Sequence, residues 1–369
     1  MASRNSNNKS DSRLNENLVF VAAAVAIAVT IAFMVALRPV VIDIGLVDRP
    51  GGRKSHPRDE PILGGIAMFA GMFSGFILIS GIAPSMPSLF VASFLILVIG
   101  ILDDRFRVPP AIRLTAQMAA VLIMVYGLQL NVAGIGNPFG TGEIFMGRFT
   151  LILTMLVTLT MINAYNLIDG VDGLAGSLAL VAFLCVAVVA GVGHVATAAA
   201  LTMSAALAGF LTFNLPFAWN RKLRAFMGDA GSTLLGFTIV WVTLQICQGS
   251  ERLISPVHCL WFASIPIYDT LTCFVRRSLA GKSPLAPGRD HFHHTLKRGG
   301  YKVREVLGIL TGLQAIYAIL ALIGHFSNVP DVVMFTTWSV LGLSQRFVIR
   351  KIAVRHRAAL LRRRHQHTT

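Results

Sequence analysis

Apolar runs long enough to cross a lipid bilayer recur along almost the whole chain. The hydrocarbon core of a bilayer is about 30 Å thick, so a spanning helix needs roughly 20 mostly apolar residues. Eleven segments of the chain approach this length, at about 18–38, 62–80, 87–102, 112–130, 150–165, 177–193, 195–213, 231–247, 254–275, 304–324 and 330–348. Charged residues make up only 13% of the chain, against about 25% in soluble domains. The sequence therefore predicts an all-α polytopic membrane protein with about eleven transmembrane helices.

Lys and Arg residues gather in alternate loops. Of the 32 in the chain, 27 lie in the stretches 38–61, 103–113, 214–230, 276–304 and 346–369. Because cytoplasmic loops carry this excess in membrane proteins, we expect the N-terminus outside and the C-terminus in the cytoplasm. Topology and attraction to anionic lipid then account for the net charge of +15 without a nucleic-acid partner.

Three further regions have their own composition. Residues 1–17 are polar and predict a disordered tail before a transmembrane domain at 18–348. The basic cytoplasmic tail at 349–369 fits a helix lying on the membrane surface. Gly, Asn and Pro between short apolar stretches at 131–149 predict a small outer β-hairpin.

Five polar clusters fall in loops of the expected cytoplasmic side. They are LVDRPGGRKSHPRDEPILGG, GILDDRFRVPP, NAYNLIDGVDGLAG, RKLRAFMGDAGS and KSPLAPGRDHFHHTLKRGG. A transporter usually places its polar groups near the bilayer midplane. Acidic groups at the membrane edge favour instead an enzyme that joins a soluble reactant to a lipid-borne one. A transporter of an anionic nucleotide or lipid is the alternative, and an inactive scaffold has no need of the acidic residues.

The acidic residues offer oxygen ligands. Asp103 and Asp104 end the third apolar segment and point about 100° apart on a helix. One can face a metal and the other a basic partner, or both can belong to a solvated helix end. Acidic groups at a helix C-terminus oppose the macrodipole, which indicates another use.

The stretch NAYNLIDGVDGLAG repeats polar residues at every third position. Asn163, Asn166, Asp169 and Asp172 share this spacing, and its glycines, Gly173 among them, let the backbone approach a ligand closely. A set of oxygen ligands without Cys favours a hard cation such as Mg²⁺ or Mn²⁺. The alternative is a polar loop with helix caps.

The two remaining clusters leave several roles open. Asp229 can be a helix cap or a ligand, and Phe226 can stack on a base or anchor the chain at the interface. The residues Arg289, His291, His293 and His294 lie on one long inner loop, where phosphate contact, zinc binding and a merely solvated loop are the alternatives. Asp269 lies inside an apolar segment without a role that the sequence assigns.

The motifs LDD, NAYNLIDGVDGLAG, FMGDAGS and GRDHFHH, in this order on inner loops, resemble the polyprenyl-phosphate N-acetylhexosamine-1-phosphate transferases. The resemblance covers nearly all of the chain, including the first inner loop VDRPGGRKSHPRDEPILGG. The pattern HFHH looks like the undecaprenyl-phosphate N-acetylglucosaminyl-1-phosphate branch. The branch that transfers phospho-N-acetylmuramoyl-pentapeptide typically has three consecutive histidines.

The resemblance implies a reaction and a location. UDP-N-acetylglucosamine would donate N-acetylglucosamine 1-phosphate to undecaprenyl phosphate and release UMP, or another UDP-N-acetylhexosamine would be the donor. The product would begin an O-antigen, common-antigen or teichoic-acid type polysaccharide. The resemblance also implies a bacterial inner membrane, an active site on its cytoplasmic face, and Mg²⁺ dependence with Mn²⁺ as the alternative. Direct attack and a double displacement both stay open, and a homodimer is compatible with the sequence.

The resemblance further implies roles for individual residues. Asp229 and Asn166 would bind Mg²⁺, whereas Asp103 and Asp104 would orient or deprotonate the lipid phosphate or assist the metal. The residues expected to contact nucleotide, sugar or phosphate are Asp169, Asp172, Gly173, Phe226, Lys54, Arg113, Arg289, His291, His293 and His294.

Overall fold

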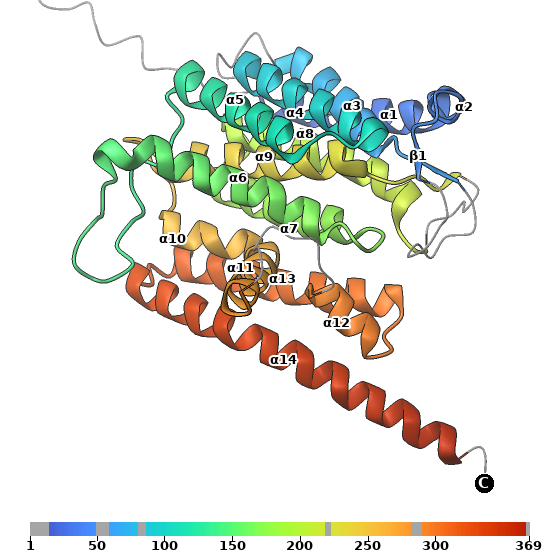
Figure 1. The fold of residues 1–369 in the computed structure, drawn as a ribbon. Coiled ribbons are helices and arrows are strands. Elements are labelled where there is room, and N and C mark those ends of the chain that lie inside the picture. Colours follow the sequence, from blue (N-terminus) through green and yellow to red (C-terminus); the bar gives the residue numbers. More distant parts are fainter. Residues whose placement is uncertain (1–14, 49–58, 80–85, 218–222, 282–289, 367–369) are drawn as a thin grey trace, which may run out of the picture.

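The computed structural model describes residues 15–48, 59–79, 86–217, 223–281 and 290–366, and this part of the chain is almost wholly helical (Figure 1). Lys54 and Arg289 lie outside the described residues. The helices are α1 (Glu16–Ala36), α2 (Arg38–Asp43), α3 (Gly64–Ile79), α4 (Met86–Phe106), α5 (Pro110–Leu128), α6 (Thr150–Ile168), α7 (Leu174–Ala190), α8 (Val195–Asn214), α9 (Gly228–Cys247), α10 (Pro256–Cys259), α11 (Ser264–Leu279), α12 (Phe292–Arg298), α13 (Val303–Phe326) and α14 (Asp331–Gln366).

Every apolar segment expected from the sequence coincides with helical structure. Seven helices in the described part are long and apolar enough to cross a membrane, and α3 and α7 are shorter apolar helices. The all-helical polytopic class is thereby confirmed, while the number of eleven spans stays a prediction. The ninth segment is not one continuous helix, because a 3-10 turn at Leu260–Ala263 separates α10 from α11. Pro256 starts α10 and Pro266 lies in the first turn of α11, the part of a helix that tolerates proline.

The sheet lies in a different place from the expected one. Residues 131–149 do fold back, with an isolated antiparallel bridge between Gly134 and Phe145, but no strand is formed in this segment. The small hairpin expected there is present as this antiparallel fold-back without regular strands, and Gly136 and Gly140 within it have positive φ. Instead β1 (Val47–Asp48) pairs antiparallel with β2 (Glu60–Pro61).

The C-terminal tail forms no separate surface helix. α14 is one continuous helix of 36 residues, about 54 Å long, and therefore longer than the bilayer is thick. Its basic end extends past α12 (Figure 1). The basic run is helical, as expected, but it continues α14 and does not start a helix of its own. Its position on the membrane surface stays a prediction.

α9 lies at the centre of the bundle, with all but a few of its residues buried. Glycines on two neighbouring helices allow a close approach to its first turn. A Cβ added at Gly65 of α3 would lie 2.5 Å from the backbone nitrogen of Gly231, and one at Gly100 of α4 would lie 2.6 Å from that of Ala230. The start of α9 is therefore held against α3 and α4, where the polar residues gather.

Candidate active site

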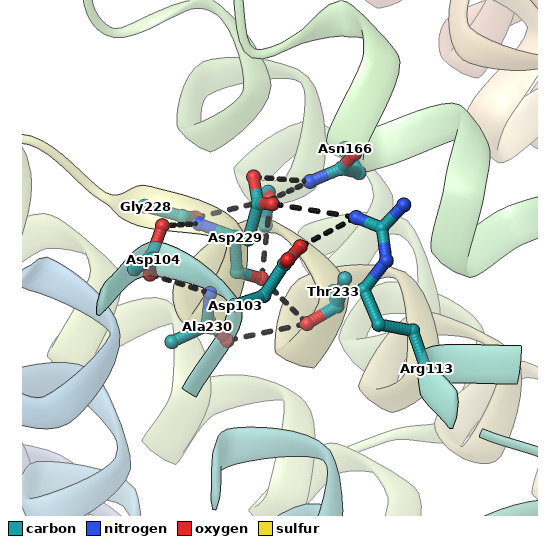
Figure 2. A network of polar contacts seen from close by, with 9 residues as sticks. Asp103, Asp104, Arg113, Asn166, Gly228, Asp229, Ala230 and Thr233 are labelled. Carbon is teal, nitrogen blue, oxygen red and sulfur yellow. Dashed lines mark hydrogen bonds and ion pairs between the residues drawn. The ribbon is translucent and has the colours of Figure 1, made fainter. Parts of the chain in front are cut away.

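The polar site forms where several helices end or begin at one end of the bundle. Asp103 and Asp104 lie at the end of α4, Arg113 in the first turns of α5, Asn166 near the end of α6, and Asp229 at the start of α9 (Figure 2). We call these five residues the carboxylate cluster. The structure thus brings together residues up to 126 positions apart in the sequence.

Asp104 caps α9 from another helix. Its Oδ1 accepts the backbone N–H of Asp229 at 2.9 Å, and its Oδ2 accepts that of Ala230 at 3.2 Å. A negative charge at this helix N-terminus is favourable, because the free N–H groups there carry partial positive charge. Asp229 itself is therefore not the cap. Gly228 has a φ of +74°, and a Cβ there would lie 2.5 Å from Asp104 Oδ2, so glycine keeps the cap accessible.

The side chain of Asp229 faces the interior of the cluster (Figure 2). Its Oδ1 accepts a hydrogen bond from Asn166 Nδ2 at 2.8 Å, and its Oδ2 lies 3.7 Å from Arg113 Nη1. The same guanidinium donates to Asp103 Oδ2 at 2.5 Å. Asn166 Nδ2 also donates to Ser232 Oγ at 3.1 Å. The amide nitrogen is therefore engaged, and the amide oxygen of Asn166 is the atom left for a ligand.

Asp169 adds a further carboxylate at the C-cap of α6. Burial, and then the carboxylates of Asp229, Asp172 and Asp104, raise the pKa of Asp169 to about 8. This region holds four carboxylates, those of Asp103, Asp104, Asp169 and Asp229. Among the described residues, Arg113 is the one cation that forms ion pairs with them. An excess of negative oxygen ligands is the donor chemistry of a site for a hard divalent cation.

The loop after α6 is held by two contacts that the sequence did not reveal. Asp172 Oδ2 accepts from Arg224 Nη2 at 2.5 Å. The buried side chain of Asn214 accepts the backbone N–H of Gly173 at 2.7 Å and donates to the carbonyl of Ala225 at 2.9 Å. A basic residue just before FMGD and an asparagine at the end of an apolar helix were the available signals. Gly173, at φ +77°, makes the turn into α7.

Phe226 is placed by β-type pairing to the segment around β2. Its N–H donates to the carbonyl of Pro61 at 2.9 Å, and its own carbonyl accepts the N–H of Gly64 at 3.0 Å. The Arg224 guanidinium lies 5.0 Å from the centroid of its half-buried ring. Phe226 is therefore fixed beside the carboxylate cluster, next to a cation.

The histidine loop is anchored on α11. The carboxylate of Asp269, only 1% exposed, lies 2.7 Å from His291 Nδ1 and accepts the backbone N–H of Phe292 at 2.7 Å. Burial by itself lowers the pKa of His291, but its hydrogen bond to Asp269 raises that pKa to about 10. His291 is thus an imidazolium at neutral pH, and Asp269, which had no assigned role, is its counter-charge.

His293 joins this loop to the carboxylate cluster. An added Cβ at Gly170 would overlap His293 Nε2, so the imidazole packs directly on the glycine of the loop after α6. Burial, and then His294 and His291, hold the pKa of His293 well below its usual value. His294 is half-buried, and its ring centroid lies 4.2 Å from that of His293. His293 thus lies against the loop that follows Asn166, and the ring centroid of His291 lies 5.8 Å from that of His293.

Comparison with known proteins assigns the chain to a family. A model described as "Glycosyl transferase family 4" matches residues 86–247, the segment that holds the whole carboxylate cluster. An undecaprenyl-phosphate alpha-N-acetylglucosaminyl 1-phosphate transferase of Yersinia pestis is 34% identical over 325 residues, covering 87% of this chain and 89% of the relative. Proteins with the same name from Escherichia coli strain K12 and Pasteurella multocida are each 35% identical, over 83% and 85% of this chain and 84% and 87% of the respective relatives. The chain therefore belongs to glycosyl transferase family 4, as an integral membrane enzyme of the polyprenyl-phosphate N-acetylhexosamine-1-phosphate transferase type.

Proposed function

We propose that this protein transfers N-acetylglucosamine 1-phosphate from UDP-N-acetylglucosamine to undecaprenyl phosphate and releases UMP. The names of its relatives support undecaprenyl phosphate as the acceptor and N-acetylglucosamine 1-phosphate as the transferred group. The observation that carries the proposal is the carboxylate cluster at the helix ends, where negative oxygen ligands exceed the positive side chains. Such a site suits two phosphate-bearing substrates, provided that cations offset their charge.

The cluster fits one Mg²⁺, with Mn²⁺ as the alternative. Asp229 and the amide oxygen of Asn166 would hold the ion, and Asp169 lies close enough to interact with the charge of Asp229. The ion would supply positive charge to the phosphate oxygens of the donor. Asp104 would act through Asp229, by holding the start of α9 in place.

The chain's own residues would then align the two phosphates. An oxygen of undecaprenyl phosphate forms a bond to the sugar-linked phosphorus, the bond from this phosphorus to the bridging oxygen breaks, and UMP leaves with the electron pair. Arg113, held by Asp103, would attract phosphate oxygens. The lipid phosphate is already largely ionised at neutral pH, so direct attack needs no strong base. Phe226 would pack on the uracil, and His291, as an imidazolium, would attract the diphosphate.

Release of UMP by the purified protein tests this proposal. The protein is incubated with undecaprenyl phosphate, Mg²⁺ and a panel of UDP-N-acetylhexosamines, and UMP and the lipid product are measured. We expect UDP-N-acetylglucosamine to be the best donor, and preference for another member of the panel would change the donor assignment. Asp229→Asn should lose most of the activity, and a wild-type rate would remove Asp229 from the metal site. Absence of UMP with every donor would overturn the reaction.

The same preparation separates this enzyme from a transporter. In proteoliposomes, a transporter of nucleotide or lipid moves labelled substrate across the bilayer without producing UMP. Substrate added on one side only also tests the expected orientation in a bacterial inner membrane. We expect UMP only when the nucleotide sugar is on the side of the basic loops.

A further inference from the structure

A basic cavity lies between α11, α12 and α14, apart from the carboxylate cluster. Its volume is about 390 Å³, and five arginines line it: Arg276, Arg298, Arg346, Arg350 and Arg357. The one acidic residue that lines it, Asp290, pairs with Arg276. Within the described residues, Arg346, Arg350 and Arg357 take part in no ion pair. The cavity therefore concentrates uncompensated positive charge.

The arginines converge for a geometric reason. Positions 346, 350 and 357 are four and seven residues apart, so they share one face of α14. Arg276 comes from α11 and Arg298 from α12, which places them on the opposite walls. Like charges around one cavity repel one another at a cost that a bound anion removes. Guanidinium groups suit phosphate oxygens in particular, because they donate paired hydrogen bonds.

The walls of the cavity are held in place. A Cβ added at Gly299, which follows α12, would lie 2.7 Å from the Cα of Ala353, so α12 and α14 touch through their backbones. Next to this contact the rings of Tyr301 and His356 stack with centroids 4.0 Å apart. The space between the arginines is therefore preformed by packing.

The cavity lies away from the histidines. Phe292 and Thr295 line it from one face of α12, together with Gly299, which follows this helix. His293 is on another face, packed against Gly170. A ligand in the arginine cavity would therefore not occupy the position of a ligand of the carboxylate cluster.

The depth and the surroundings of the cavity match a lipid headgroup. Arg346 and Arg350 lie about 22 and 28 Å along α14 from Asp331, close to the thickness of the hydrocarbon core. Leu343 and Phe347 are 78% and 72% exposed beside the arginine face. An apolar strip next to a cationic pocket fits acyl chains beside a phosphate group.

We propose that this cavity binds the phosphate headgroup of an anionic phospholipid. Basic pockets between transmembrane helices on the cytoplasmic side are suited to such headgroups. A soluble phosphate shares the headgroup chemistry but would not use the apolar strip, which separates the two sources in an experiment.

Native mass spectrometry of the full-length protein tests the proposal, after extraction from nanodiscs of phosphatidylcholine with and without phosphatidylglycerol. The pocket variant is the double substitution Arg350→Gln/Arg357→Gln. The matched control, Arg355→Gln/Arg362→Gln, removes the same charge from the opposite face of α14. We expect the pocket variant to retain phosphatidylglycerol about tenfold less than wild type, and the control to retain it as wild type does. Equal loss in both variants, or in neither, would overturn the proposal.

Two further measurements keep the result unambiguous. Arg350→Lys/Arg357→Lys keeps the charge but removes the paired donors, so we expect it to retain more lipid than the glutamine variant. Equal loss in the lysine and glutamine variants, with thermal midpoints below that of the control, would point to damaged packing and overturn the assignment. Inorganic phosphate is titrated against the lipid-loaded wild type. Its displacement of phosphatidylglycerol at micromolar concentration would assign the cavity to a soluble anion instead.

Discussion

The carboxylate of Asp104, at the end of α4, accepts the backbone N–H of Asp229, 125 residues later in the sequence, at 2.9 Å. Asp104 thereby accepts hydrogen bonds from free N–H groups at the start of α9, the helix that carries Asp229. The position of Asp229, and with it the proposed metal site, depends on this contact between the two helices.

Loss of the Asp104 cap should lower both stability and activity. Asp104→Ala leaves the N–H groups of Asp229 and Ala230 without their acceptor. We expect a cost of about 0.5–2 kcal/mol, as for other helix caps, and a fall in UMP release larger than this loss explains. Thermal unfolding in detergent and the UMP assay measure the two effects. Asp43→Asn, at an exposed position in α2, is the control. A fully active Asp104→Ala would contradict the positioning role.

Removal of the Asn166 amide should mainly weaken metal binding. Asn166→Ala deletes the proposed oxygen ligand and the hydrogen bond to Asp229. We expect the Mg²⁺ concentration for half-maximal UMP release to rise about tenfold or more. Ser232→Ala removes the second acceptor of the same amide but keeps the amide oxygen and the bond to Asp229, and it should shift this concentration much less. An unchanged Mg²⁺ dependence in Asn166→Ala would exclude this residue from the metal site.

A methyl group at Gly170 should separate the histidine loop from the cluster. The added Cβ overlaps His293 Nε2, so the imidazole must move. We expect a raised KM for the nucleotide sugar, together with a lower rate. Gly308→Ala is the matched control, because no atom lies within 4 Å of the Cβ that it adds. Equal kinetics for the two variants would show that the contact between Gly170 and His293 does not matter for substrate binding.

The pair of Asp269 and His291 should make stability depend on pH in a defined direction. The pKa of His291 is raised from its usual 6.5 to about 10. Protonated His291 therefore stabilises the folded state fully below pH 6.5, and this contribution is lost as the pH rises through about 10. We expect the thermal midpoint of the wild type to fall across this range.

Asp269→Asn should remove this pH dependence. It leaves the buried imidazole without its counter-charge, so we expect a destabilisation at pH 7 of about 3 kcal/mol. Asp290→Asn breaks the neighbouring pair with Arg276, whose side chain is 47% exposed, and should cost under about 1 kcal/mol. A thermal midpoint for Asp269→Asn that follows the wild-type pH curve would refute the ion pair.

The ion pair of Asp172 with Arg224 should couple two segments of the site. The partners are 21% and 28% exposed, so screening by water is only partial. A double-mutant cycle with Asp172→Asn and Arg224→Gln should give a coupling energy of about 1 kcal/mol in thermal unfolding. Additive effects would show that this ion pair does not couple the two segments, which would leave Asn214 and its two backbone contacts as their link.

The amino-acid sequence by itself determined the class of protein and the positions of its helices. Each apolar segment coincides with helical structure, because a chain in lipid must pair its backbone groups within each segment. Within NAYNLIDGVDGLAG, α6 ends at Ile168 with Asp169 as its C-cap, just before two glycines that oppose the continuation of a helix. The order of the motifs along the chain was sufficient to identify the family, because this combination of residues is highly specific.

Only the tertiary structure decided which polar groups meet. Arg224 pairs with Asp172, Asp269 with His291, and His293 packs on Gly170, at separations that no local pattern encodes. The break between α10 and α11 and the continuous α14 also escaped the sequence. Hydrophobic periodicity reports which elements form, because each element is stabilised locally. Which charged side chains pair depends instead on how helices that are distant in the sequence pack together. At this site that packing brings the polar residues at the helix ends into contact.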